Sequence, residues 1–269
     1  MINGIINIYK ERGYTSHDVV AKMRGILRQR KIGHTGTLDP DAEGVLPVCL
    51  GSATKLCDMM TDKSKEYQAV LLLGVSTDTQ DITGKIMEER SVECDEEKIR
   101  AVISSFIGQY MQIPPMYSAL KVNGQKLVDL ARAGIEIERK ARPVEIFNIQ
   151  IQEINLPRVR FLVHCSKGTY IRTLCADIGE KLGCLGTMES LIRTRAASFT
   201  LENAISLGQL EKARDADEVE KYIIHTEQYF IDLPLAVIKE EYQKYADNGN
   251  KLKLHFLEIK DRLVDKTQL

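Results

Sequence analysis

The chain of 269 residues has no long hydrophobic run, no closely spaced cysteine pair and no surplus of positive charge. No apolar stretch approaches the roughly 20 residues that a membrane-spanning helix needs, and no basic-then-apolar leader opens the sequence, so we expect a cytoplasmic protein without a membrane partner. The six cysteines form no C-x-x-C pair, which favours reduced thiols over zinc ligands or disulfides. The formal net charge of −1 argues against a generic polyanion binder such as a DNA-coating protein.

Positive charge is gathered in one place, directly before a glycine-rich stretch. Five basic residues fall within ten positions there: Lys22, Arg24, Arg28, Arg30 and Lys31. A run of charge is often only the solvated face of a helix, and a local surface for RNA phosphates is the other interpretation. The residues alone leave both open.

The glycine-rich stretch, residues 33–44, reads Gly-His-Thr-Gly-Thr-Leu-Asp-Pro-Asp-Ala-Glu-Gly. Three glycines, a proline and three carboxylates cannot sustain a helix or a strand, so the pattern predicts a shaped loop that holds side chains in place. The spacing of Asp39, Asp41 and Glu43 suggests a calcium loop, but the twelfth position is Leu50 rather than a bidentate glutamate. We therefore predict chemistry without a metal, with an acidic turn capped by threonine as the plain structural alternative.

The spacing of apolar residues predicts a mixture of strands and helices, and hence an α+β fold. Strands are expected at residues 4–9, 45–50, 66–75, 82–88, 144–154 and 159–165. Helices are expected after a cap at Thr15 or Ser16, at 52–62, at 95–109 and up to Leu182, where Gly183 ends the last one. The Asn123-Gly124 pair predicts a hairpin turn, followed by a short helix that Gly134 stops.

Two further stretches could carry function. Residues 166–172, Ser-Lys-Gly-Thr-Tyr-Ile-Arg, lie at the head of a predicted helix, but the glycine follows the lysine, which argues against a phosphate loop and nucleotide hydrolysis. Residues 191–199 read Leu-Ile-Arg-Thr-Arg-Ala-Ala-Ser-Phe.

These stretches, with residues 33–55, closely resemble three ordered signatures of the TruB family of bacterial tRNA pseudouridine synthases. The resemblance extends over about residues 3–210. It implies a pseudouridine synthase fold, with a central mixed, mostly antiparallel sheet flanked by helices. Two positions depart from the family pattern: Glu11 stands where the family has proline after lysine, and Ala197 where it has glycine.

The resemblance implies a role for eight residues. Three would be catalytic: Asp39 as the nucleophilic carboxylate, Arg172 as its partner, and Tyr67 stacked on the uracil and relaying a proton. Five would bind substrate: Tyr170 and Leu191 against the base, His34 propping the nucleotides around the flipped base, and Lys121 and Arg193. By residue type alone, Tyr67 could equally be a packing residue, and His34 a hydrogen-bonded turn residue or a general base.

The implied reaction converts the T-loop uridine at position 55 of tRNA into pseudouridine. It cleaves the glycosidic bond, rotates the base and re-attaches it through carbon, so it imports no atom, changes no oxidation state and needs no cofactor. Three routes stay open for Asp39, namely attack on the uracil ring, attack on the ribose carbon, or removal of a sugar proton. The expected partner is the T-stem loop of tRNA, bound by a monomer.

The resemblance also suggests a domain organisation. Residues 1–234 would form the catalytic domain, in which residues 112–143 are a thumb-like RNA-binding insertion. Residues 235–269 would form a short remnant of a PUA domain, because so few residues cannot bury an independent core.

Two other classes of function compete with this interpretation. An RNA-binding or tRNA-folding module without turnover would keep the basic patch and the thumb, yet would not need Asp39, Tyr67, Tyr170 and Arg172 together. A carboxylate enzyme such as a glycosidase would need a second catalytic acid in a matching motif, and the sequence offers none.

Overall fold

The structure, a computed structural model, describes residues 1–230, 233 and 235–259, and it divides into two compact units. The first comprises residues 1–223 and the second begins at residue 224. Within the described residues no helix is both long and apolar enough to cross a bilayer.

A nine-stranded sheet runs through the first unit in the order β1-β3-β12-β4-β11-β10-β7, with β2 beside β3 and β13 beside β12. Strands β3 and β12 run parallel, whereas β1, β4, β10 and β11 pair with their neighbours in antiparallel fashion. The expected mixed, mostly antiparallel sheet is confirmed. Its strands are β1 (Gly4–Lys10), β2 (Ile32–His34), β3 (Glu43–Leu50), β4 (Lys65–Leu73), β7 (Gly108–Gln112), β10 (Arg142–Asn155), β11 (Arg158–Cys165), β12 (Gly186–Ala196) and β13 (Phe199–Thr200).

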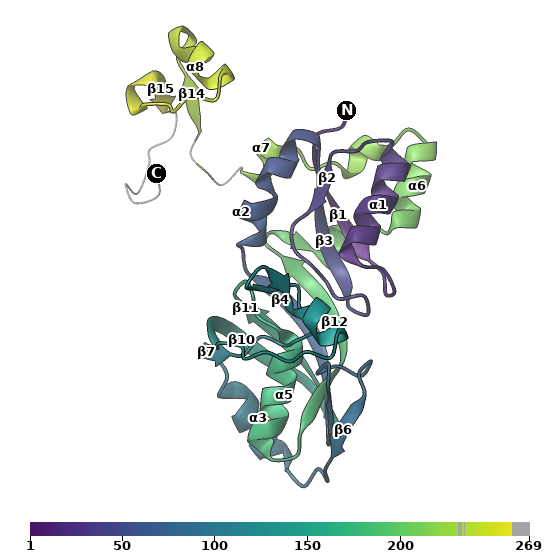
Figure 1. The fold of residues 1–269 in the computed structure, drawn as a ribbon. Coiled ribbons are helices and arrows are strands. Elements are labelled where there is room, and N and C mark those ends of the chain that lie inside the picture. Colours follow the sequence, from purple (N-terminus) through teal and green to yellow (C-terminus); the bar gives the residue numbers. More distant parts are fainter. Residues whose placement is uncertain (231–232, 234, 260–269) are drawn as a thin grey trace. The chain divides into compact units, whose positions relative to one another are not determined.

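Helices flank this sheet at both of its ends (Figure 1). They are α1 (Ser16–Leu27), the 3-10 helix η1 (Gly51–Leu56), α2 (Cys57–Thr61), α3 (Glu96–Ser104), α5 (Ile171–Leu182) and α6 (Leu207–Asp215). Helix α1 starts at Thr15 because the threonine side chain and Asp18 cap each other's backbone N–H groups. Helix α5 ends at Gly183, which adopts φ +85° as a left-handed C-cap, as the sequence predicted.

Two apolar clusters hold these layers together. In one, the alternating inward side chains of β4, β10, β11 and β12 pack against α3 and α5. In the other, α1 and α6 pack on β1 and β3. The loop at residues 35–42 connects β2 to β3, and its Leu38 and Ala42 side chains pack in the first cluster.

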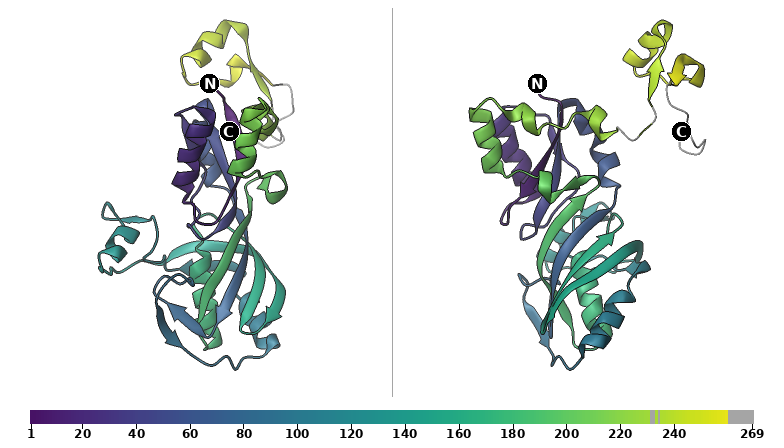
Figure 2. Two further views of the ribbon diagram at one scale, coloured as in Figure 1. Left: turned by 90° about the vertical axis from the view of Figure 1, so that its right-hand side faces the viewer. Right: turned by 180° about the vertical axis from the view of Figure 1, so that it is seen from behind.

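The segment between β7 and β10 forms a separate small lobe (Figure 2). It contains the hairpin β8 (Lys121–Val122) and β9 (Gln125–Lys126), followed by α4 (Leu127–Arg132). Both hairpin turn residues have positive φ, 51° at Asn123 and 83° at Gly124, and Gly134 follows the helix at φ +72°. The turn and the short helix predicted here are confirmed.

Several predicted elements differ from the structure. The helix expected at 95–109 ends at Ser104, and Gly108, at φ +107°, begins β7 instead. The strand expected at 82–88 begins only at residue 86, as β6 (Ile86–Glu89), and it pairs with β5 (Val75–Thr77). The helix expected at 52–62 is a 3-10 turn before it becomes α-helical.

The second unit is small and irregular. Strand β14 (Ala236–Ile238) pairs antiparallel with β15 (Leu257–Ile259), and short turns η4 (Glu240–Tyr242), α8 (Gln243–Asp247) and η5 (Leu254–Phe256) lie between them. Tyr242 stacks on Phe256 with ring centroids 4.1 Å apart. Apolar residues recur between Leu252 and Ile259 with the spacing of a strand, but the chain turns at η5 and only Leu257–Ile259 is extended. Residues 260–269 of the expected remnant lie outside the described residues.

Candidate active site

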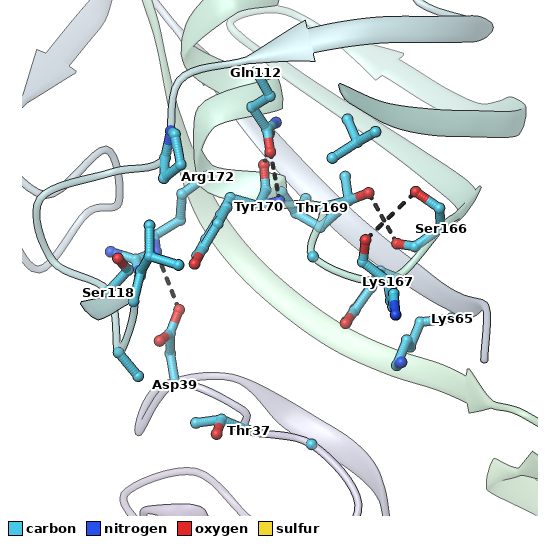
Figure 3. A pocket seen from close by; sticks show the side chains of 18 of the residues that line it. Thr37, Asp39, Lys65, Gln112, Ser118, Ser166, Lys167, Thr169, Tyr170 and Arg172 are labelled. Carbon is cyan, nitrogen blue, oxygen red and sulfur yellow. Dashed lines mark hydrogen bonds and ion pairs between the residues drawn. The ribbon is translucent and has the colours of Figure 1, made fainter. Parts of the chain in front are cut away.

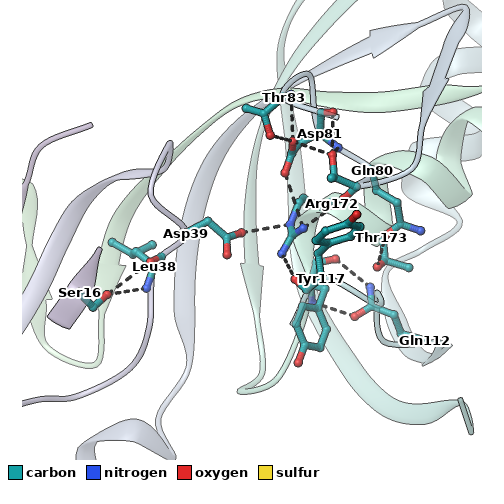
Figure 4. A network of polar contacts seen from close by, with 12 residues as sticks. Ser16, Leu38, Asp39, Gln80, Asp81, Thr83, Gln112, Tyr117, Arg172 and Thr173 are labelled. Atoms are coloured by element: carbon teal, nitrogen blue, oxygen red, sulfur yellow. Dashed lines mark hydrogen bonds and ion pairs between the residues drawn. The ribbon is translucent and has the colours of Figure 1, made fainter. Parts of the chain in front are cut away.

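The loop that carries Asp39 is fixed on both sides of that residue, and Figure 4 shows the contact between Leu38 and Ser16 on one of them. On one side, the Leu38 N–H donates to Ser16 Oγ at 2.9 Å, at the first turn of α1. On the other, the fully buried Lys10 Nζ donates to the Pro40 carbonyl at 3.1 Å. Burial lowers the pKa of Lys10 to about 8. The backbone of Asp39 is thereby held by groups that belong to the packed core.

A close approach of two strands supports the end of the same loop. Gly44 adopts φ +105°, and a Cβ there would lie 2.3 Å from the Arg193 carbonyl oxygen, so only glycine fits. Arg193, 1% exposed, donates from Nε to the Val45 carbonyl at 2.7 Å and from Nη1 to the Thr37 carbonyl at 3.4 Å. Strand β12 therefore supports the loop through the hydrogen bonds of Arg193.

Asp39 is paired with Arg172, as the resemblance implies. Arg172 Nε lies 3.0 Å from Asp39 Oδ2, and the guanidinium is buried. Its Nη1 donates to the Thr79 carbonyl at 3.1 Å and lies 3.6 Å from Asp81 Oδ2, and its Nη2 donates to the Tyr117 carbonyl at 2.8 Å. The guanidinium is thus oriented from several directions and presents one edge to Asp39.

The environment makes the Asp39 carboxylate more basic than a free one. Burial among protein atoms raises its pKa, although 42% of the side-chain surface stays open to the cavity, while the adjacent Arg172 acts in the opposite direction. The nearby Asp81 charge raises the pKa further. A basic, oriented carboxylate of this kind suits attack on an electron-poor carbon or removal of a proton.

Asp39 opens into a cavity of about 520 Å³ (Figure 3). That volume falls within the range of sites for small molecules or a single extruded nucleotide. Six of the eight residues predicted for the site line it: Asp39, Tyr67, Tyr170, Arg172, Leu191 and Arg193. The fold therefore brings the predicted side chains together from β4, β12, the start of α5 and the loop before β3.

Tyr67 and Arg193 interact within this lining. Burial raises the pKa of the Tyr67 hydroxyl, and the Arg193 guanidinium beside it opposes that rise. Burial in turn lowers the pKa of Arg193. Arg193 Nη2 is buried and lacks a hydrogen-bond partner within the described residues. The pair thus places a neutral phenol next to a cation in the cavity.

The other two predicted residues lie outside the cavity lining. His34 accepts the Gly36 N–H at Nδ1 across 3.3 Å and packs edge-on against His17, with ring centroids 5.3 Å apart. Burial, followed by the influence of His17 and Arg193, lowers the pKa of His34, so its ring is neutral at neutral pH. Lys121 is exposed on β8.

The sequence did not indicate two residues that orient the site. Asp81 and its turn contribute two of the acceptors around Arg172. Gln112 holds the backbone of Tyr170 from both sides, because its Nε2 donates to the Tyr170 carbonyl at 3.0 Å and its Oε1 accepts the Tyr170 N–H at 2.8 Å. Gln112 is 1% exposed at the end of β7, a strand that the sequence did not predict, so no local pattern pointed to it.

The other carboxylates of the loop point to separate partners. Asp41 pairs with Arg12 at 3.1 Å, and Glu43 accepts the Tyr9 hydroxyl at 2.8 Å. In the part of the chain that the structure describes, no group of three or more His, Cys, Asp or Glu side chains is placed to hold a metal ion.

Two family models match the chain. One, described as TruB family pseudouridylate synthase (N terminal domain), matches residues 24–171, and one described as tRNA pseudouridylate synthase B C-terminal domain matches residues 172–230. Together they span most of the first unit and the start of the second.

Known proteins are similar along nearly the whole chain. The tRNA pseudouridine synthase B of Lachnoclostridium phytofermentans is 54% identical over 259 residues, covering 93% of this chain and 84% of that protein. The protein of the same name from Alkaliphilus oremlandii is 48% identical over 256 residues, covering 95% and 85%. A chain in a solved Cbf5-Nop10-Gar1 complex superposes with a TM-score of 0.76 at 32% identity, covering 94% of this chain and 69% of that one.

Sheet, cavity and sequence matches together define a pseudouridine synthase, an isomerase that forms pseudouridine. Within that class, the chain belongs to the TruB family.

Proposed function

We propose that this protein converts the T-loop uridine at position 55 of tRNA into pseudouridine, with Asp39 as the essential carboxylate. The observation that carries the proposal is the pairing of Asp39 with the buried Arg172 at the mouth of a nucleotide-sized cavity. Relatives named tRNA pseudouridine synthase B support tRNA as the substrate.

The reaction breaks the bond from the ribose C1′ to N1 of uracil, and a bond from C1′ to C5 replaces it. The C5 proton is lost and N1 gains one, so the product is an isomer. Attack on the ring, attack on C1′ and removal of a sugar proton all use a carboxylate oxygen of Asp39. Each route therefore depends on Arg172, which fixes the direction of that oxygen.

The detached base must be retained while it turns. Tyr67 stacks on the ring, and Tyr170 and Leu191 form the rest of the pocket around it. The hydroxyl of Tyr67 relays the proton: it gives its own proton to N1 of the detached uracil, Arg193 stabilises the phenolate that remains, and the phenolate takes the proton that C5 loses, which restores the phenol. Since the transfers are internal to the substrate and the protein, no cofactor takes part.

The target base reaches this cavity only if the nucleotide leaves the folded T-loop. His34 props the vacated space by stacking, a role suited to a neutral ring. Lys121, exposed on the lobe between β7 and β10, contacts phosphate. Residues 112–143 thus act as the thumb of a catalytic domain, residues 1–234, that binds the T-stem loop as a monomer, and residues 235–269 are a PUA-like remnant.

The test is to incubate the protein with a T-loop RNA hairpin and to map modified bases by carbodiimide–alkali treatment and primer extension. A new stop at the T-loop uridine is expected with the wild type. Asp39→Asn, nearly isosteric, should give no stop while its RNA affinity stays within about tenfold of wild type. Isomerisation that persists in Asp39→Asn would refute the role of Asp39, and no stop with the wild type would refute the substrate.

A further inference from the structure

One buried hydroxyl in the cavity has no assigned role. Among the described residues, the buried side-chain atoms without a hydrogen-bond partner include two that belong to cavity-lining residues, Arg193 Nη2 and Ser118 Oγ. Ser118 is 5% exposed. A hydroxyl kept from water without a partner destabilises the free protein, so its presence in a ligand cavity calls for a partner that the ligand supplies.

The fold of the segment does not need this hydroxyl. The Ser118 N–H donates to the Met116 carbonyl at 2.9 Å, and the Ser118 carbonyl accepts the Val128 N–H at 3.0 Å. The backbone therefore fixes Ser118 by itself, and the side chain is left to the cavity.

The position of Ser118 indicates which part of the nucleotide it meets. Its neighbour Tyr117 offers the carbonyl that accepts from Arg172 Nη2 at 2.8 Å. Figure 3 shows Ser118 on the same side of the cavity as Arg172 and Asp39, with Ser166 and Lys167 on the other side. Because the proposed function places Asp39 at or beside the glycosidic bond, a nucleotide bound there would bring the oxygens that flank that bond to the side of the cavity where Ser118 lies.

We propose that Ser118 Oγ binds the target nucleotide by a hydrogen bond to an oxygen flanking the glycosidic bond, either the ribose 2′-hydroxyl or the 2-carbonyl of uracil. The inference rests on the proposed function, since it takes the target uridine as the ligand. A serine hydroxyl both donates and accepts, so it satisfies either oxygen. The contact holds the sugar and the base in register with Asp39 before the bond breaks.

The experiment measures the affinity of Asp39→Asn, which halts turnover, for three T-loop hairpins with uridine, 2′-deoxyuridine or 2-thiouridine at the target position. Removing the oxygen that Ser118 contacts should weaken binding by about 3- to 10-fold, the effect of one neutral hydrogen bond. In Asp39→Asn/Ser118→Ala the uridine hairpin and the hairpin that lacks this oxygen should bind with nearly equal affinity. The hairpin that responds identifies the oxygen.

Ser166→Ala, in the Asp39→Asn background, is the matched control. It removes a hydroxyl from the same cavity, but Ser166 Oγ already accepts the Glu145 N–H at 2.9 Å. Ser166→Ala should lower Tm and leave unchanged the two affinity ratios, namely uridine hairpin to 2′-deoxyuridine hairpin and uridine hairpin to 2-thiouridine hairpin. Ser118→Ala should keep or slightly raise Tm. If Ser118→Ala leaves both ratios as they were, or lowers Tm as Ser166→Ala does, the proposal is wrong.

These readings are distinct from failure of the proposed function. That failure is reported by wild-type enzyme making no pseudouridine in the uridine hairpin, whereas the role of Ser118 is read from binding ratios without turnover.

Discussion

Arg172 Nε lies 3.0 Å from Asp39 Oδ2, yet Asp39 is only one of the groups that the guanidinium touches. The remaining nitrogens reach Asp81 and two backbone carbonyls, those of Thr79 and Tyr117. The arginine is therefore oriented before substrate arrives, and it transfers that orientation to the carboxylate. Five predictions follow from the site, its strands and the second unit.

Arg172→Lys should lower the rate of the chemical step by about 10²- to 10³-fold with the fold intact, because a point charge cannot replace a planar group that serves several acceptors. Single-turnover kinetics on a T-loop hairpin measures the effect. Arg160→Lys, at an exposed pair with Glu153, is the control and should behave as wild type. A near-normal rate for Arg172→Lys would show that the arginine serves packing or phosphate binding.

Asp81→Asn should move the acid limb of the pH–rate profile to lower pH. Burial is the largest cause of the raised Asp39 pKa, and the Asp81 charge adds to it. Removing that charge lowers the Asp39 pKa, so the ionised form persists to lower pH. Single-turnover rates between pH 4 and pH 8 test this, and an unmoved or alkaline-shifted limb would contradict it.

Asp39→Asn should raise the free energy of unfolding at pH 7 relative to wild type. The pKa of Asp39 is higher in the native state than in the unfolded state. At a pH between the two values the native carboxyl is more often protonated than the unfolded one, so the stability of the wild type falls as the pH rises through that window. Asparagine carries no such penalty. The advantage of the variant should shrink as pH falls through the window, and urea unfolding at several pH values measures it. An equal difference at every pH would show that ionisation is not its source.

Ala197→Gly should stabilise the protein by about 1 kcal/mol, because a non-glycine residue in left-handed backbone costs roughly 1–2 kcal/mol. Ala197 adopts φ +54° at the turn from β12 to β13, the position where the family pattern has glycine. Ala204→Gly is the matched control, since Ala204 has φ −90° and should lose stability on the same change. Thermal unfolding decides the matter, and a lower Tm for Ala197→Gly would count against the argument.

Removing residues 240–269 should leave activity on a T-loop hairpin within about twofold, and weaken binding of full-length tRNA several-fold, because so short a segment has little core of its own. Every cavity-lining residue falls between Gly36 and Arg193, within the first unit. Steady-state kinetics on hairpin and on tRNA compares the two substrates. Loss of hairpin activity in a folded truncation would show that the second unit contributes to the site.

Local pattern in the sequence was enough to predict most of the strands, whereas the residues that line the cavity were predicted only from the resemblance to the three TruB signatures. Strand β11 alternates cleanly, with Val159, Phe161 and Val163 fully buried on one face. The glycines, proline and carboxylates around Asp39 predicted a loop at residues 33–44, and the structure has that loop at residues 35–42, because the two residues at each end belong to β2 and β3. Both signals depend only on neighbours along the chain.

Strand β12 was not predicted, although it lies near the middle of the sheet. Its pairing with β4 shifts register between Met188 and Ser190 and again between Arg193 and Arg195, which breaks the alternation that marks a strand. An arginine in a sequence suggests an exposed position, and the burial of Arg193 is explained only by the backbone carbonyls to which it donates. Asp81 was missed for a related reason. Its turn contacts Arg172 through the Thr79 carbonyl, and Thr79 and Arg172 are 93 positions apart in the sequence.

The contact between Arg172 and the Tyr117 carbonyl joins the lobe between β7 and β10 to the carboxylate of Asp39. Gln112, at the end of β7 where that lobe begins, grips the Tyr170 backbone two positions before the same arginine. A movement of the lobe away from α5 would break the hydrogen bond between Arg172 and the Tyr117 carbonyl, which helps to orient the arginine beside Asp39. If the lobe binds RNA and Asp39 reacts with it, as proposed above, then binding and reactivity are coupled, and an RNA that displaces the lobe leaves Asp39 without its orienting contact.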